Sequence, residues 1–300
     1  MKCLLAGIAL AWGGIAAAAE EPGAPEDAPQ VAVEALRQLS AEVQEILARE
    51  NVQSMFDRTA RLKDLGLSYQ PDLLAPGRPD PSWARCQLQQ FAGLKLFDVV
   101  YAIAFQKRQE TADAMQCLDE IVTALDLRSH ADFSGRSYAI LKKAAEDPGA
   151  IDVRQTLNEL ADSLVAEIPV ALSSPVTAHF LMDSLYGFSI EAAHVMGYFQ
   201  RHDATGKLRA QLYDEPARPG REPWMQMVLR AFAAFERQAA ALGIDCDAPG
   251  KLDVVRSIAQ VVEDEQAGRI PEENRAAIWD EIGEQIAAMR RSILRAGVGN

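Results

Sequence analysis

The sequence lacks the short motifs that identify the commonest enzyme classes. After residue 19 it contains no nucleophile elbow, no P-loop and no dinucleotide-binding glycine fingerprint. Histidine and cysteine are scarce, with 4 residues each, and no cysteines have the CxxC spacing of a zinc site. These absences favour a non-catalytic protein, and we predict neither a cofactor nor a bound metal ion.

Positive charge is also in short supply. The chain has 30 Lys and Arg residues against 43 Asp and Glu residues, which gives a formal net charge of -13. Nucleic acids and anionic membrane surfaces are bound by proteins that present excess positive charge. The sequence therefore predicts no nucleic-acid partner, and we attribute its acidity to solubility.

Long apolar runs are absent except at the N-terminus. Lys2 supplies a positive charge, residues 3–16 are apolar, and Ala17 and Ala19 supply the small residues of an A-x-A cleavage site. The run is shorter than the ~20 apolar residues that a helix needs to cross a bilayer. We predict that residues 1–19 are a signal peptide, that the mature protein is exported, most simply to a bacterial periplasm, and that it has no integral membrane segment.

The rest of the chain reads as helical. Residues 20–30 are acidic and rich in proline, which predicts a flexible leader. Over residues 31–300 apolar residues recur with helical spacing, and no stretch alternates with a period of two for long enough to predict a strand. We predict an all-α fold, an irregular bundle of roughly ten helices with antiparallel hairpins. It forms one domain or two closely packed subdomains, residues 31–200 and 221–300.

Several helix boundaries have local signals. Residues 83–127 predict a helical hairpin that turns near residues 107–109. Asp152 and Gln155 form a capping-box pair at a helix start, and Pro169 is expected to end that helix. Ser174 followed by Pro175 predicts the N-cap and first residue of the next helix, which runs to about residue 200.

The cysteines permit at most one intramolecular disulfide after Cys3 leaves with the signal peptide. In the predicted hairpin, Cys86 and Cys117 lie roughly 20 Å apart at ~1.5 Å per residue, far beyond disulfide range. Cys117 shares its helix with apolar neighbours and is predicted to be a buried thiol. The possible disulfide joins Cys86 and Cys246.

Polar residues on apolar helices are the candidate site. Asp98 interrupts the apolar run LKLFDVVYAIAF, and Tyr101 lies one turn later on the same side. A second helix carries Glu191 and His194, three residues apart. One hypothesis is an interior pocket in which Asp98, Tyr101, Glu191 and His194 bind a small polar ligand. The other is a core network, in which Asp98 pairs with His194 or Tyr101 and fixes the helix packing.

The same region raises a metal hypothesis. Glu191-x-x-His194 is half of the pattern found in di-iron bundles, and His179 and Asp183 are spaced as two ligands on one helix. A di-iron site needs a second Glu-x-x-His, and the sequence contains none. The alternative to a non-catalytic protein is therefore a metal-dependent or acid-base enzyme that uses Glu191 and His194 with Asp98 and Tyr101.

A set of residues on these two helices has the pattern of a known family: Leu94, Asp98, Tyr101, Phe105, Gln109, Glu110, Gly187, Ile190 and Glu191. On these residues the chain resembles a family of exported, all-helical proteins and lipoproteins of Gram-negative bacteria that has no assigned activity. The resemblance covers about residues 91–199, and this chain has Lys95 and Ser189 where the family tends to have glycine and tryptophan. The resemblance implies a shared architecture and no particular chemistry. Our first hypothesis is a non-catalytic periplasmic protein that binds a protein partner or a small polar ligand.

Overall fold

The structure, a computed structural model, describes residues 28–80, 82–130, 135–202, 224–239, 241–242 and 251–295. Within these ranges it contains ten α-helices and no strand, which confirms the all-α class. The α-helices are α1 (Ala28–Ile46), α2 (Arg49–Asp64), α3 (Arg85–Ala104), α4 (Arg108–Ala124), α5 (Arg136–Glu146), α6 (Val153–Ala171), α7 (Pro175–His202), α9 (Trp224–Ala239), α10 (Lys251–Gln266) and α11 (Glu272–Arg295). Two short 3₁₀ helices are η1 (Pro71–Leu73) and η2 (Leu127–Ser129).

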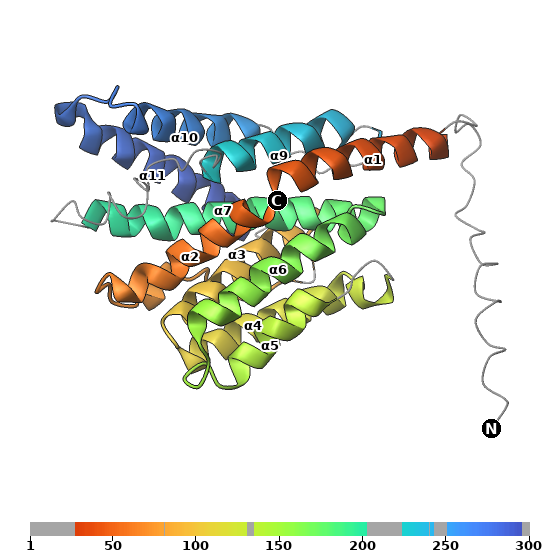
Figure 1. The fold of residues 1–300 in the computed structure, drawn as a ribbon, viewed down its shortest axis with the longest axis horizontal. Coiled ribbons are helices and arrows are strands. Elements are labelled where there is room, and N and C mark those ends of the chain that lie inside the picture. The colour runs from red at the N-terminus through yellow and green to blue at the C-terminus, as the bar shows by residue number, and fades with distance from the viewer. Residues whose placement is uncertain are drawn as a thin grey trace.

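The helices form two groups on either side of α7. Figure 1 shows α1, α9, α10 and α11 along one side of α7, and α2 to α6 on the other. The two predicted subdomain segments are in contact, because α1 packs against α9 while α11 packs against α7 and α3. Among the described helices, none combines the length and the apolar character needed to span a bilayer.

Helix α3 is the centre of the bundle. Of its residues, only Arg85, Cys86 and Leu96 escape full burial. A helix that is buried around its whole circumference must be covered by neighbours on every side. The covering helices are α2, α4, α5, α6, α7 and α11.

Two glycines allow α3 and α7 to touch through their backbones. A Cβ atom added to Gly93 would lie 2.0 Å from the carbonyl oxygen of Ser184, and one added to Gly187 would lie 1.9 Å from that of Gln90. Only glycine permits such an approach. The contacts Gln90–Asp183, through a hydrogen bond, and Phe97–Phe188, through their rings, follow the same order along both helices, so α3 and α7 pack in a parallel sense.

The predicted hairpin is present as α3 and α4, joined by residues 105–107. The predicted start of α6 is also present, since the Asp152 side chain accepts a hydrogen bond from the Gln155 amide at 3.0 Å. Helix α7 begins at Pro175, where the Ser174 hydroxyl accepts from the backbone N–H of Thr177. The capping residues and the proline therefore predict the starts of α6 and α7 correctly.

Two predicted boundaries are wrong. Pro169 does not end α6, which continues to Ala171; a proline in the last turn removes one backbone N–H bond without preventing the remaining turn. Helix α1 begins at Ala28, inside the predicted flexible leader, because Pro29 in the first turn is compatible with a helix start. The signal peptide and residues 20–27 lie outside the described residues.

An extended segment lies between α2 and α3. Residues 69–77, here named the strap, contain η1 and pass over α3. Leu73 and Ala75 are buried, whereas Pro71, Pro76 and Gly77 are exposed. The prolines in this region predict an extended loop, which is confirmed apart from the single turn of η1.

Candidate functional site

Asp98 is fully buried, at 0% exposure, and its carboxylate is held from two directions. The backbone N–H of Ala75 in the strap donates to both oxygens, at 3.3 and 3.2 Å. Lys95, one turn earlier on α3, places its ammonium 3.2 Å from Oδ2. Lys95 also donates to the Ala75 carbonyl, so one strap residue binds both members of the ion pair.

Glu191 on α7 is also at 0% exposure, and its partner comes from α11. Arg290 Nε donates to Oε2 at 2.6 Å and Nη2 donates to Oε1 at 2.9 Å, which makes the pair bidentate. The same Nη2 donates to the carbonyl of Leu73 at 2.9 Å. Arg290 therefore connects α7, α11 and the strap.

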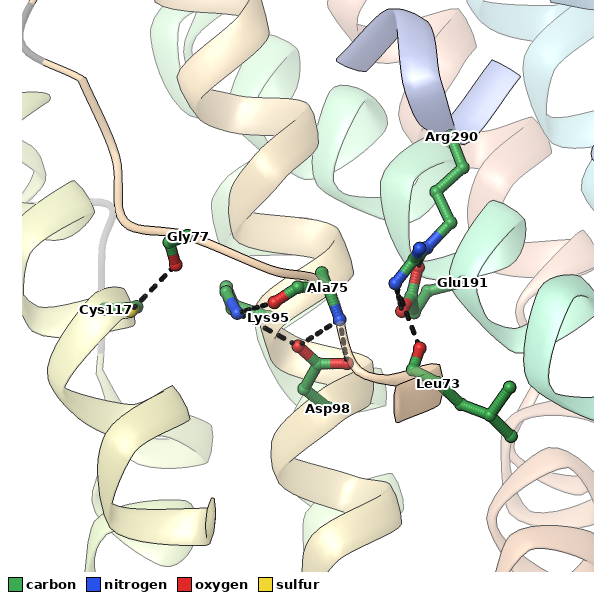
Figure 2. Close-up of polar contacts among 8 residues, drawn as sticks. All are labelled: Leu73, Ala75, Gly77, Lys95, Asp98, Cys117, Glu191 and Arg290. Carbon is green, nitrogen blue, oxygen red and sulfur yellow. Dashed lines mark hydrogen bonds and ion pairs between the residues drawn. The ribbon is translucent and has the colours of Figure 1, made fainter. Parts of the chain in front are cut away.

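The strap lies across both ion pairs. Figure 2 shows Lys95 and Asp98 beside Ala75, and Glu191 with Arg290 beside Leu73. The charged side chains bind main-chain N–H and C=O groups of the strap, so these contacts are independent of its side chains. Prolines remove backbone donors from this segment, Leu73 and Leu74 donate within the strap, and Gln70 and Ala75 donate to α3.

Both carboxyl groups are perturbed by burial. Burial and the nearby Glu191 raise the pKa of Asp98 well above its usual range, against the opposing effects of Lys95 and the Ala75 N–H. Burial also raises the pKa of Glu191, and the hydrogen bonds from Arg290 oppose that rise. The two buried acids therefore act on each other electrostatically.

Tyr101 makes a different contact with the strap. Its hydroxyl accepts a hydrogen bond from the backbone N–H of Gln70 at 3.1 Å. Its ring stacks on Tyr69 with centroids 5.1 Å apart and meets Phe105 edge-on at the same distance. Burial raises the pKa of Tyr101 to about 12. Tyr101 thus anchors one end of the strap within an aromatic cluster.

His194 is half-buried on α7, close to the cationic side chains of α7 and α11. Burial, Arg290 and Arg201 lower the pKa of His194 to about 4. The imidazole is therefore neutral at physiological pH.

His179 and Asp183 form a separate cluster nearer the start of α7. Their Nε2 and Oδ2 atoms are 2.8 Å apart, and Gln90 donates to the other Asp183 oxygen at 2.9 Å. The His179 ring also lies 6.2 Å from that of Phe235 on α9. These two residues connect α7 to α3 and α9, away from the strap.

Of the four predicted site residues, Asp98, Tyr101 and Glu191 therefore have hydrogen-bond partners inside the protein. For His194 the structure shows partial burial and the electrostatic effect of Arg290 and Arg201. Sequence reasoning missed Lys95, Arg290 and the strap as the main partners. Lys95 has a detectable signal, because residues three apart share a helix face. Arg290 is 99 residues from Glu191 and carries no local signal.

The described cysteines, Cys86 and Cys117, are not bonded to each other, as expected. Cys117 is buried as predicted, and its thiol lies 3.9 Å from the carbonyl of Gly77. Cys246 lies outside the described residues, and the Cys86–Cys246 disulfide stays a prediction.

A surface groove lies between α4 and α5, with a volume of about 540 Å³. Pockets that take small molecules typically have volumes of ~300–1,000 Å³ and combine apolar walls with a few polar groups. Ala112, Met115 and Ala145 supply apolar surface here. The other lining residues are Arg108, Gln109, Gln116, Asp119, Lys142 and Glu146.

Within the described ranges, no three His, Cys, Asp or Glu side chains come together in a way that could hold a metal ion. Comparisons of the chain with protein-family models, curated proteins and solved structures give no match. The resemblance to exported helical proteins therefore stays a hypothesis.

Proposed function

We propose that the protein is a non-catalytic helical protein of the periplasm that binds a small polar ligand or a protein partner. The observation that carries this proposal is that both buried acids are already bound by groups of the protein itself. Glu191 is held by Arg290 through both oxygens, and Asp98 is covered by Lys95 and Ala75. A general acid or base must reach a substrate proton, and these carboxyls are closed off by the strap.

The α4–α5 groove is the best-placed binding site for a small polar ligand. It is open to the surface, it has a suitable volume, and Arg108 and Lys142 line it from opposite helices. Asp119 at one end is already bound by Arg128, at 2.6 Å, and by the Tyr138 hydroxyl. Arg108 and Lys142 are the two cations of the groove and suit a polar or anionic group, while Glu146 is the other acid that lines it.

A thermal-shift screen tests the proposal. Purified mature protein is scanned against amino acids, dipeptides, sugars and sugar phosphates, and any compound that raises the melting temperature is titrated by calorimetry. We expect Lys142→Ala to weaken binding at least tenfold, and Lys143→Ala to leave it unchanged. Lys143 is the matched control because it is exposed on α5 but does not line the groove. Equal affinity for both variants would refute this location.

Export and the enzyme alternative have separate tests. The intact mass of protein recovered from the periplasm should correspond to a chain that begins at Glu20. Metal analysis of protein purified without chelators addresses the alternative based on Glu191 and His194. Stoichiometric zinc or iron would favour that enzyme over a non-catalytic binding protein.

A further inference from the structure

The α4–α5 groove has a cation and an acid at one of its ends. Arg108 is the first residue of α4 and Glu146 is the last residue of α5, and both line the groove. The two helices run antiparallel, since Tyr138 near the start of α5 donates a hydrogen bond to Asp119 in the second half of α4. The N-terminus of α4 and the C-terminus of α5 therefore lie at the same end of the groove.

The two helix ends add to these charges. The first backbone N–H groups of a helix have no partner within the helix and carry partial positive charge, whereas its last carbonyls carry partial negative charge. The start of α4 therefore reinforces Arg108 in attracting a carboxylate. The end of α5 reinforces Glu146 in attracting an ammonium group. An α-amino acid carries both of these groups on one carbon atom.

Lys142 supplies a third charge further along the groove. It lies one helical turn before Glu146 on α5, which is a rise of ~6 Å at ~1.5 Å per residue. Ala112, Met115 and Ala145 line the same groove with apolar surface. A short aliphatic side chain that ends in a second carboxylate fits this arrangement.

These three charges are available to a ligand. Within the described part of the chain, the side chains of Arg108, Lys142 and Glu146 form no hydrogen bond or ion pair, and all three are exposed. By contrast, Gln116 and Asp119 are already held by other side chains of the protein. The charged groups that line the groove without a partner are therefore two cations and one acid.

We propose that the groove binds a free acidic amino acid, with its α-carboxylate at Arg108, its ammonium group at Glu146 and its side-chain carboxylate at Lys142. This ligand carries two negative groups and one positive group, the complement of the two cations and one acid that line the groove. The inference rests on the proposed function, because it names the ligand class of the groove assigned there.

Calorimetry with L-glutamate and three analogues at one ionic strength tests each contact. Glutarate lacks the ammonium group, γ-aminobutyrate lacks the α-carboxylate, and L-glutamine lacks the side-chain charge. Hydrogen bonds to charged groups are stronger than neutral ones, so we expect each analogue to bind at least about fivefold more weakly than L-glutamate. Equal affinities for L-glutamate and glutarate would overturn the inference.

Two variants assign these preferences to residues. Glu146→Gln keeps the side-chain shape without the charge, so the preference for L-glutamate over glutarate should disappear. Lys142→Ala should remove the preference for L-glutamate over L-glutamine. Asp147→Asn is the matched control, because Asp147 is an exposed acid that directly follows α5 and does not line the groove, and it should keep both preferences. A preference for L-glutamate over glutarate that survives in Glu146→Gln would overturn the inference.

The outcomes separate the ligand class from the location of the site. If another compound of the screen binds, Lys142→Ala weakens it more than Lys143→Ala does, and L-glutamate does not bind, the groove stands and the acidic amino acid is wrong. If L-glutamate binds equally well to the wild type, Lys142→Ala and Glu146→Gln, both the groove and the ligand class assigned to it are wrong.

Discussion

The backbone contact between α3 and α7 makes Gly187→Ala the sharpest test of the packing. The added Cβ would lie 1.9 Å from the carbonyl oxygen of Gln90. An ordinary carbon–oxygen contact is ~3.3 Å, so the two backbones must separate by about 1.4 Å. Overfilling a packed core costs typically ~1–3 kcal/mol, and here the obstructing atom is main chain, which cannot rotate away as a side chain can.

We therefore expect a loss of about 3 kcal/mol from the free energy of unfolding. At roughly 2–4 °C per kcal/mol for a chain of this size, the melting temperature should fall by about 6–12 °C. Differential scanning calorimetry measures the melting temperature, and urea titration measures the free energy. The mirror variant Gly93→Ala should behave similarly, since its Cβ would lie 2.0 Å from the Ser184 carbonyl oxygen.

Gly197→Ala supplies the matched control on the same helix. A Cβ there meets nothing within 4 Å, so alanine should stabilise α7 by roughly 0.5–1 kcal/mol through helix propensity. Opposite signs for Gly187→Ala and Gly197→Ala are the expected pattern. If Gly187→Ala left the melting temperature unchanged, or raised it as the control does, the close approach of α3 and α7 would be wrong.

Three further predictions concern single side chains. Arg290→Met leaves Glu191 buried without its cation and should cost about 3–5 kcal/mol by urea unfolding; a loss below 1 kcal/mol would contradict the buried pair. His194 has a folded-state pKa of about 4 against about 6.5 when unfolded, so its contribution to stability is complete above pH 6.5 and lost as the pH falls towards 4. Titration of the His194 ring by NMR checks this, and a midpoint near 6.5 would refute the burial. Asp152→Ala removes the N-cap of α6 and should cost about 1 kcal/mol, measured by chemical denaturation against Asp152→Asn, which retains a capping oxygen.

The sequence carries strong signals for helices and weak signals for their partners. Apolar spacing, the Asp152 cap and the Ser174–Pro175 start are local, and the structure contains the helices they predict. Pro169 predicts the end of α6 wrongly. The destabilisation that a proline causes depends on its position in the helix, and it is small in the last turn. The parallel packing of α3 on α7 joins segments about 90 residues apart. Neither Gly93 nor Gly187 has a sequence neighbour that predicts this contact.

The candidate site was partly predictable for the same reason. An acid within an apolar helix requires a partner, which correctly singles out Asp98 as a residue that something must contact. The partner on the same helix, Lys95, follows from its spacing of three residues. Ala75 and Arg290 do not follow from the sequence, because they meet the site only when the strap and α11 fold onto it.

The glycine contact and the two buried acids lie on the same pair of helices, α3 and α7. Glu191 lies one helical turn after Gly187, and Asp98 lies five residues after Gly93, so both acids follow the glycine contact closely on their own helices. Both acids are fully buried, and a buried carboxylate without a partner is costly, so each is paired with its own cation. Those cations come from different elements, α3 and α11, and both also hold the strap. The burial of the two carboxyl groups therefore brings in the two cations that also bind the strap, through the carbonyls of Ala75 and Leu73.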